Sequence, residues 1–159
     1  TRHLKQVHAV AERYEQRYAL VVYQLDHAPK LHSTYGRPFI DLAVGRLGND
    51  IAAECRDADL PGPLDPFSCL VLLPGTGQRG AFTQVERVLG RFGRHAFKQG
   101  DARLQLSCSA GVSCYPQNGA LSADGALKSA LTALDAARGK DGERIVAIAA
   151  AGAAAADAQ

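Results

Sequence analysis

Methionine and tryptophan are absent from the sequence, and neither one sign of charge nor a long apolar run dominates it. The 18 basic and 16 acidic side chains leave a net charge of +2. This balance argues against a general nucleic-acid binder with a massed cationic face, but it allows a small anionic ligand held by a few arginines. No apolar run approaches the roughly 18 residues that a membrane span needs, and no charged-then-apolar leader is present. We therefore expect a soluble, cytoplasmic domain with no membrane span in this fragment.

The start at Thr1 and the lack of methionine indicate a fragment of a longer protein, whose other parts could include a tether to the inner membrane. Cysteine is also scarce: Cys55, Cys69, Cys108 and Cys114 show no C-x-x-C spacing and no flanking histidine pairs. These features favour reduced, mostly buried thiols over a disulfide framework or a metal site. We predict no bound metal and no cofactor.

The periodicity of the 159 residues predicts one domain in which strands and helices alternate. Apolar residues recur at helical spacing in four segments, and short β-rich runs lie between them. The expected helices cover residues 1–17, 38–55, 82–92 and a segment that Ser122 caps, and the expected strands cover residues 19–25, 67–73, 104–109 and 144–148. This order predicts an α/β sandwich, a central mixed sheet with helices packed on it.

The chain divides into a connector helix (1–18), one folded domain (19–148) and an Ala-rich tail (149–159). The tail has no partner face, and we expect it to be disordered. Within the domain we expect an irregular turn through Pro29 and Gly36, a helix break at Gly100-Asp101 and a tight turn at Ala110 to Val112.

The stretch from Arg56 to Pro74 combines a damaged strand with a charged pair. Its second half is an unbroken apolar run typical of a buried strand. The segment before that run carries three prolines, Pro61, Pro63 and Pro66. Because each proline removes a backbone donor, we expect the hairpin of these two arms to be disrupted. Arg56 and Asp59 lie just ahead of the damaged arm, at the end of a helical pattern.

Several short motifs follow one another at characteristic spacing. They are Leu25-Asp26-His27, Thr34-Tyr35-Gly36, Asp41, Asp59-Leu60, Leu70 to Thr76, Val85-Glu86-Arg87, Ser109 to Val112, Ala137-Arg138 and Arg144 to Val146. As an ordered set they resemble the GGDEF domain of diguanylate cyclases, the bacterial enzymes that condense two GTP into cyclic di-GMP (c-di-GMP). The resemblance covers about Ala19 to Ile148 and implies a GGDEF or nucleotidyl-cyclase-like fold.

The resemblance also implies that catalysis has been lost. The family's Gly-Gly-Asp/Glu-Glu-Phe signature falls on Asp65 to Cys69, where no residue matches. The two glycines let the backbone approach the nucleotide, which Pro66 prevents, and the acidic pair binds metal, which Phe67 and Ser68 cannot do. The family's other metal-binding aspartate falls on Gln24. Because phosphoryl transfer relies on carboxylate-held metal ions, we expect no cyclase activity.

The positions that hold GTP in the family are only partly kept. The guanine-reading Asn falls on His32, while the guanine-reading Asp is kept as Asp41. Of the two cations that hold the phosphates, Arg138 remains and Gly142 replaces the other. Asp41 and Arg138 also have a structural role, since an acid in a first helical turn and a base in a last turn favour the helix dipole. We expect His32, with Asp26, in a loop that ends the first strand.

The product-inhibition site of the family, by contrast, is kept in this sequence. In the family it consists of an Arg-x-x-Asp motif before the signature and an arginine on the next helix, which correspond to Arg56, Asp59 and Arg87. Guanidinium groups can bind guanine O6/N7 or a phosphodiester, and a carboxylate can accept from guanine N–H groups. The resemblance thus implies a c-di-GMP site, which in the family takes two mutually intercalated ligand molecules, and we expect the same here.

Each of these residues also has a structural alternative. Arg56 could stabilise the end of a helix, and Asp59 could initiate the proline-containing turn that follows it. Arg87 could be a solvated arginine beside Glu86 on an exposed helix face.

The sequence therefore predicts a catalytically inactive GGDEF-type domain that acts as a c-di-GMP receptor. Receptors of this kind regulate the production or secretion of exopolysaccharides such as Pel or cellulose. The expected partners are neighbouring domains, a second copy of the chain, or the polysaccharide machinery, bridged by the two faces of a ligand dimer. One alternative is a protein-interaction or dimerisation module without nucleotide binding, and another is a GTP-binding regulatory domain that uses Asp41 and Arg138.

Overall fold

The computed structural model describes residues 2–13, 16–116, 122–138 and 145–147 of the chain. Within this part the chain forms five helices and seven strands. In chain order they are α1 (Arg2–Arg13), β1 (Tyr18–Leu25), α2 (Ala28–Tyr35), α3 (Arg37–Ala53), β2 (Leu60–Asp65), β3 (Ser68–Pro74), α4 (Gln78–Gly93), β4 (Phe97–Gln99), β5 (Ala102–Leu104), β6 (Cys108–Tyr115), α5 (Ala123–Arg138) and β7 (Ile145–Ala147).

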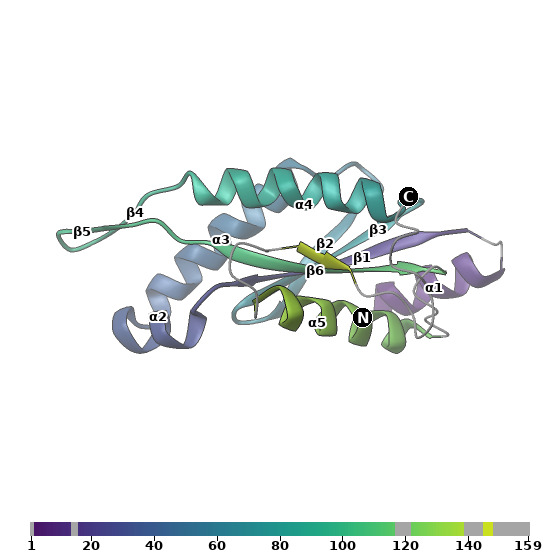
Figure 1. The fold of residues 1–159 in the computed structure, drawn as a ribbon, viewed down its shortest axis with the longest axis horizontal. Helices are drawn as coiled ribbons and strands as arrows, with labels where there is room; N and C mark the ends of the chain where they lie inside the picture. Colours follow the sequence, from purple (N-terminus) through teal and green to yellow (C-terminus); the bar gives the residue numbers. More distant parts are fainter. Residues whose placement is uncertain (1, 14–15, 117–121, 139–144, 148–159) are drawn as a thin grey trace.

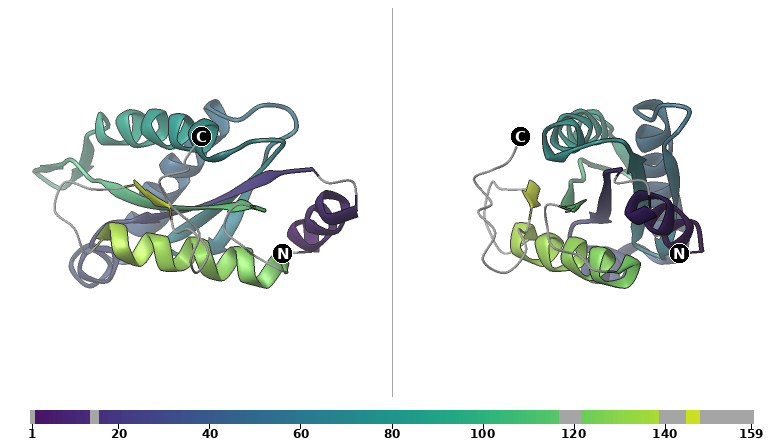
Figure 2. Two further views of the ribbon diagram at one scale, coloured as in Figure 1. Left: turned by 45° about the vertical axis from the view of Figure 1, so that its right-hand side comes forward. Right: turned by 90° about the vertical axis from the view of Figure 1, so that its right-hand side faces the viewer.

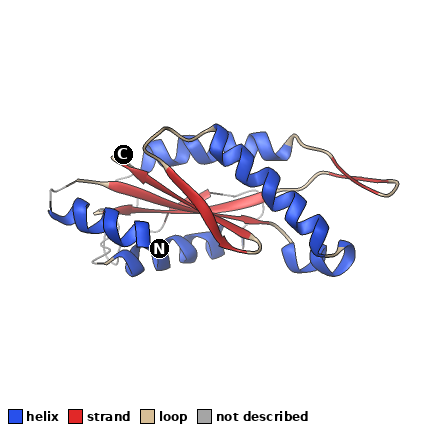
Figure 3. Cartoon of the chain, turned by 180° about the vertical axis from the view of Figure 1, so that it is seen from behind, coloured by secondary structure: helices blue, strands red, loops and turns tan. Residues whose placement is uncertain are grey.

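Five strands form the central sheet in the order β2-β3-β1-β6-β7. The pairs β2/β3, β3/β1 and β1/β6 are antiparallel, and β6/β7 is parallel. The sheet is therefore mixed, and helices flank it, as the sequence predicts (Figures 1 and 3). The two remaining strands, β4 and β5, pair with each other and extend away from the body of the molecule (Figure 1).

Helices α3 and α4 cover one face of the sheet, and α5 and α1 lie on the other (Figures 1 and 2). The central strand β1 is buried on both faces because its side chains alternate between two cores. Val21 and Tyr23 face the core under α3 and α4, whereas Leu20 and Val22 face the core shared with α1 and α5. Two-sided burial explains why this strand reads as an unbroken apolar run.

The proline-bearing arm remains a strand, so the expectation of a disrupted hairpin is wrong. Strand β2 pairs with β3 from Leu60 opposite Leu72 to Asp65 opposite Ser68, with one irregularity before Asp65. Because β2 lies at the edge of the sheet, it needs partners on one side only. Pro61 and Pro63 are two residues apart and so withhold N–H groups on the same side of the strand, which an edge strand tolerates.

Two segments expected to be turns are regular elements. The segment after β1 forms helix α2, in which Pro29 occupies the first turn, where its missing N–H costs no helical bond. His32 therefore lies in a helix and not in a loop. Residues 110–112 lie inside β6, where a Cβ on Gly111 would come 2.1 Å from the carbonyl oxygen of Ala130 in α5. Gly111 is thus needed for the close approach of α5 to the sheet.

The region around Gly100 also differs from the expectation. Helix α4 ends at Gly93, and Gly100 lies in the tight connection of the β4–β5 hairpin, which the helical pattern did not indicate. The predicted strand at 104–109 is replaced by the end of β5 and the start of β6. The predicted cap of the last long helix is confirmed, since the N–H of Gly125 donates to Ser122 Oγ at 3.0 Å.

Some expectations lie outside the described residues, namely those for Thr1, Gly142, Arg144, Ile148 and the tail 149–159. Where the chain is described, α1 packs on the domain through Leu4 and Ala11, which are buried. Among the described residues, no helix has the length and apolar character needed to cross a bilayer.

Candidate functional site

The three residues predicted to bind the ligand line a single surface hollow of about 300 Å³. The hollow lies where the loop after α3, strand β3 and helix α4 meet. Its lining residues are Glu54, Arg56, Asp59, Leu73, Thr76, Gly80, Thr83, Gln84 and Arg87. The structure thus brings Arg56 and Asp59 together with Arg87, which follows them by about 30 positions in the sequence.

The Arg-x-x-Asp spacing closes a tight turn between α3 and β2. The N–H of Asp59 donates to the carbonyl oxygen of Arg56 at 3.0 Å, and the N–H of Arg56 donates to Asp59 Oδ2 at 2.8 Å. The Asp59 side chain is only 2% exposed, so this backbone bond is one of the contacts that satisfy its carboxylate. The turn gives Asp59 a structural role and also fixes its position in the hollow.

The guanidinium group of Arg56 is anchored through one nitrogen. Its Nη2 donates to Asp59 Oδ1 at 3.2 Å, to the carbonyl oxygen of Pro74 at 3.1 Å and to Thr76 Oγ1 at 2.7 Å. The side chain is nevertheless 62% exposed. Arg56 therefore has a fixed position and retains exposed surface for a ligand.

The second predicted arginine, Arg87, projects from α4 and shares an acidic neighbour with another arginine. Glu54 Oε1 lies 4.0 Å from Arg87 Nη1, and Glu54 Oε2 accepts from Arg91 Nη2 at 2.9 Å. The Arg87 side chain is 68% exposed, whereas that of Glu54 is 16% exposed. The longer, more exposed contact leaves Arg87 free to turn towards a ligand, while Arg91 keeps Glu54 paired.

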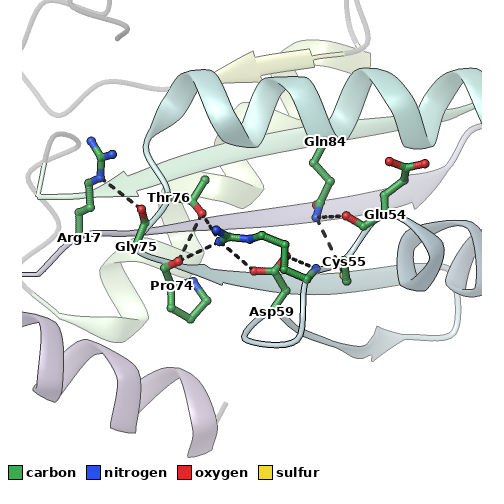
Figure 4. Close-up of polar contacts among 9 residues, drawn as sticks. Arg17, Glu54, Cys55, Asp59, Pro74, Gly75, Thr76 and Gln84 are labelled. Atoms are coloured by element: carbon green, nitrogen blue, oxygen red, sulfur yellow. Dashed lines mark hydrogen bonds and ion pairs between the residues drawn. The ribbon is translucent and has the colours of Figure 1, made fainter.

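Gln84 of α4 is buried and points towards Glu54 and Cys55 (Figure 4). Its Oε1 accepts from the Tyr23 hydroxyl at 3.3 Å, and its Nε2 donates to the carbonyl oxygen of Glu54 at 3.5 Å and contacts Cys55 Sγ at 3.9 Å. Burial, with the nearby charge of Asp59, raises the pKa of the Cys55 thiol to about 11, so this thiol stays protonated at neutral pH.

Six residues that line the hollow were not predicted as site residues, namely Glu54, Leu73, Thr76, Gly80, Thr83 and Gln84. Glu54 lies two positions before Arg56, and Thr76 lies in a glycine-rich turn, but neither pattern indicates a site by itself. Both depend on tertiary contacts, since Thr76 reaches Arg56 across 20 positions of the sequence.

Of the positions at which the resemblance predicts metal ligands, Gln24 and Ser68 have side chains bonded to each other. Gln24 Nε2 donates to Ser68 Oγ at 3.0 Å, and Gln24 Oε1 accepts from Arg138 Nη1. Arg138 also pairs with Asp135 in its own helix. A neutral amide, a hydroxyl and a guanidinium do not fit a divalent cation, which prefers carboxylate oxygens. Among the described residues, no group of three or more His, Cys, Asp or Glu side chains is placed to hold a metal.

The residues expected to contact GTP also have local partners. Asp41 Oδ1 accepts from Arg37 Nε at 2.9 Å one helical turn away, and both side chains are exposed. The ring of His32 lies edge-on to that of Phe67, with 6.2 Å between centroids. Asp41 and Arg138 thus have different partners, and neither lines the hollow of Arg56 and Asp59.

A mixed sheet with helices on both faces and this arrangement of motifs defines a nucleotidyl-cyclase-like α+β domain. The family profile described as "Diguanylate cyclase, GGDEF domain" matches residues 1–144. The chain belongs to the GGDEF domain family. No curated protein sequence matches the chain significantly.

Solved structures confirm the diguanylate cyclase fold. The GGDEF domain of DgcB from Caulobacter crescentus, in complex with c-di-GMP, is similar with a TM-score of 0.83 and 17% identity over 91% of this chain and 85% of that chain. The active GGEEF domain of a diguanylate cyclase from Vibrio cholerae has a TM-score of 0.81 and 19% identity over 91% of each chain. The diguanylate cyclase SiaD from Pseudomonas aeruginosa, in complex with its activator SiaC, has a TM-score of 0.80 and 25% identity over 94% of this chain and 56% of that chain.

Proposed function

We propose that this domain is a catalytically inactive GGDEF domain that binds c-di-GMP as a signalling receptor. The observation that carries the proposal is the hollow that Arg56, Asp59 and Arg87 line together. An arginine can donate to guanine O6 and N7 or to a phosphodiester, and the Asp59 carboxylate can accept from guanine N–H groups. The complex of the similar DgcB domain with c-di-GMP supports this choice of ligand.

The loss of catalysis is supported by the bonded set of Gln24, Ser68 and Arg138. These groups satisfy one another, so that a nucleotide and a metal would have to break existing hydrogen bonds to enter. Asp41 is likewise paired with Arg37. The same observations disfavour a GTP-binding regulatory role.

The receptor would act in the cytoplasm by docking to a partner when the ligand binds. We propose a neighbouring domain or a second copy of the chain as the first contact, with exopolysaccharide production or secretion as the regulated process. The SiaD structure with its activator SiaC illustrates a protein partner for a relative of this family. A ligand dimer with two exposed faces would bridge the two surfaces.

Titration calorimetry with c-di-GMP and with GTP tests the proposal directly. We expect saturable c-di-GMP binding, with two ligand molecules per domain if the ligand binds as an intercalated dimer, and no heat from GTP. Incubation with GTP and magnesium should yield no c-di-GMP. If neither ligand binds, the domain is an interaction module, and if c-di-GMP is formed, the domain is an enzyme.

Gly80 provides a way to disturb the site with little effect on the fold. A Cβ at this position of α4 would lie 2.9 Å from Thr76 Cγ2, so the Thr76 side chain, which accepts a hydrogen bond from Arg56, would have to shift. For Gly80→Ala we expect several-fold weaker c-di-GMP binding. The thermal stability should change little, because the gain in helix propensity, up to about 1 kcal/mol, offsets the cost of the crowded methyl group.

Gly90→Ala is the matched control for Gly80→Ala. Gly90 lies in the same helix and is exposed, and its nearest contact for a Cβ is Arg94 Nη1 at 3.9 Å, an ordinary distance. Gly90→Ala should raise the stability of the domain and leave its c-di-GMP affinity unchanged. Equal affinities for the two variants would show that Thr76 does not position Arg56 for the ligand.

A further inference from the structure

A second hollow of about 440 Å³ adjoins the first at the loop between β3 and α4. It is lined by Arg17, Arg56, Gly75, Thr76, Gly77, Arg79 and Gly80. Arg56, Thr76 and Gly80 line both hollows, so the two form one continuous surface around the Arg56 side chain.

The two hollows differ in charge. The first contains two arginines, Arg56 and Arg87, and two carboxylates, Glu54 and Asp59. The second contains three arginines and no carboxylate among its lining residues. Acceptors and donors side by side suit a nucleobase edge, whereas guanidinium groups without a carboxylate suit a phosphate group.

Arg17 is held in position by two bonds to the loop. The N–H of Gly75 donates to the carbonyl oxygen of Arg17 at 2.8 Å, and Arg17 Nε donates back to the carbonyl oxygen of Gly75 at 3.4 Å. The two terminal nitrogens of Arg17 point away from Gly75 in Figure 4. The backbone of Arg17 thus has a defined position, and its charged end is available at the rim of the second hollow.

Arg79 lies where the helix itself disfavours a cation. It occupies the first turn of α4, which contains no acidic residue, and the partial positive charge of a helix amino terminus repels an arginine there. An arginine in this place therefore lowers the stability of the helix. Binding of an anion in the second hollow would offset this cost.

We propose that Arg17 and Arg79, together with Arg56, bind a phosphodiester group of the ligand, while the first hollow binds its guanine edge. This inference rests on the proposed function and assigns the two chemical parts of c-di-GMP to two adjoining surfaces. Arg56 lies in both and would contact base and phosphate together. Arg17 and Arg79 contribute by charge, so their contribution weakens as salt screens it.

The test compares c-di-GMP affinity over a range of salt, roughly 50 to 500 mM KCl, at which charge screening changes strongly. The double variant Arg17→Gln/Arg79→Gln should bind at least about tenfold more weakly at low salt, with a flatter salt dependence than the unchanged chain. Arg37→Gln/Arg103→Gln removes two exposed arginines that line neither hollow and gives the same net charge. This control should match the unchanged chain.

Asp59→Asn separates base recognition from phosphate recognition. It should weaken binding without flattening the salt dependence, because it removes a carboxylate of the first hollow and no cation. Unchanged affinity and salt dependence in the Arg17/Arg79 double variant would overturn this inference alone. No c-di-GMP binding by the unchanged chain would overturn the proposed function, and this inference with it.

Discussion

Arg56→Ala is expected to lower the affinity for c-di-GMP about 10- to 100-fold, the effect of losing hydrogen bonds from a charged donor. The Arg56 side chain is anchored by Asp59, Pro74 and Thr76 and is still 62% exposed. It can therefore bind a ligand with little further loss of side-chain entropy, because it is already ordered. Calorimetry measures the change, and a thermal melt shows whether the fold is kept.

Arg37→Ala is the control for this variant. Arg37 has nearly the same side-chain exposure, 61%, and also pairs with an aspartate, Asp41 at 2.9 Å. Arg37 lies at the start of α3 and does not line the hollow of Arg56. Its removal should leave c-di-GMP affinity unchanged. Equal losses of affinity in Arg56→Ala and Arg37→Ala would mean that c-di-GMP binding depends on the total charge of the domain and not on this site.

Gly111→Ala is expected to destabilise the fold by about 3 kcal/mol or more, because the new methyl group overlaps backbone that cannot rotate away. Its Cβ would lie 2.1 Å from the oxygen of Ala130 and 2.3 Å from the nitrogen of Leu134. Helix α5 would have to move off the sheet and leave space beneath it. Against a typical total of about 5–15 kcal/mol, such a loss should shift the urea midpoint strongly.

Gly45→Ala provides the comparison for Gly111→Ala. Gly45 is exposed in α3, and a Cβ there would have nothing within 4 Å. This substitution should stabilise the domain by up to about 1 kcal/mol, since alanine loses less backbone entropy in a helix. A midpoint for Gly111→Ala close to that of the unchanged chain would show that α5 does not pack on β6 at this distance.

Secondary structure was predicted correctly where the apolar pattern of a segment and its intrinsic helix or strand propensity agree. The apolar run of β1 and the helical periodicity of α3 locate these elements to within one or two residues. Predictions were wrong where a residue type was interpreted without its neighbours. Pro29 indicated a turn but lies in the first turn of α2, and Gly111 indicated a turn but permits contact between β6 and α5. Both of these errors came from a glycine or proline whose role depends on position in the fold.

By itself, the sequence determined the order of the longest helices and central strands and the family, because apolar periodicity and motif spacing are properties of the chain. The Arg56–Asp59 turn depends on local contacts as well, since residues three apart meet within one turn. Only the tertiary structure decided that the proline-bearing β2 still pairs with β3, because an edge strand needs hydrogen bonds on one side only. That pairing places Leu60 opposite Leu72 and so brings Arg56 to Pro74 and Thr76. The hollow exists because segments far apart in the sequence meet there.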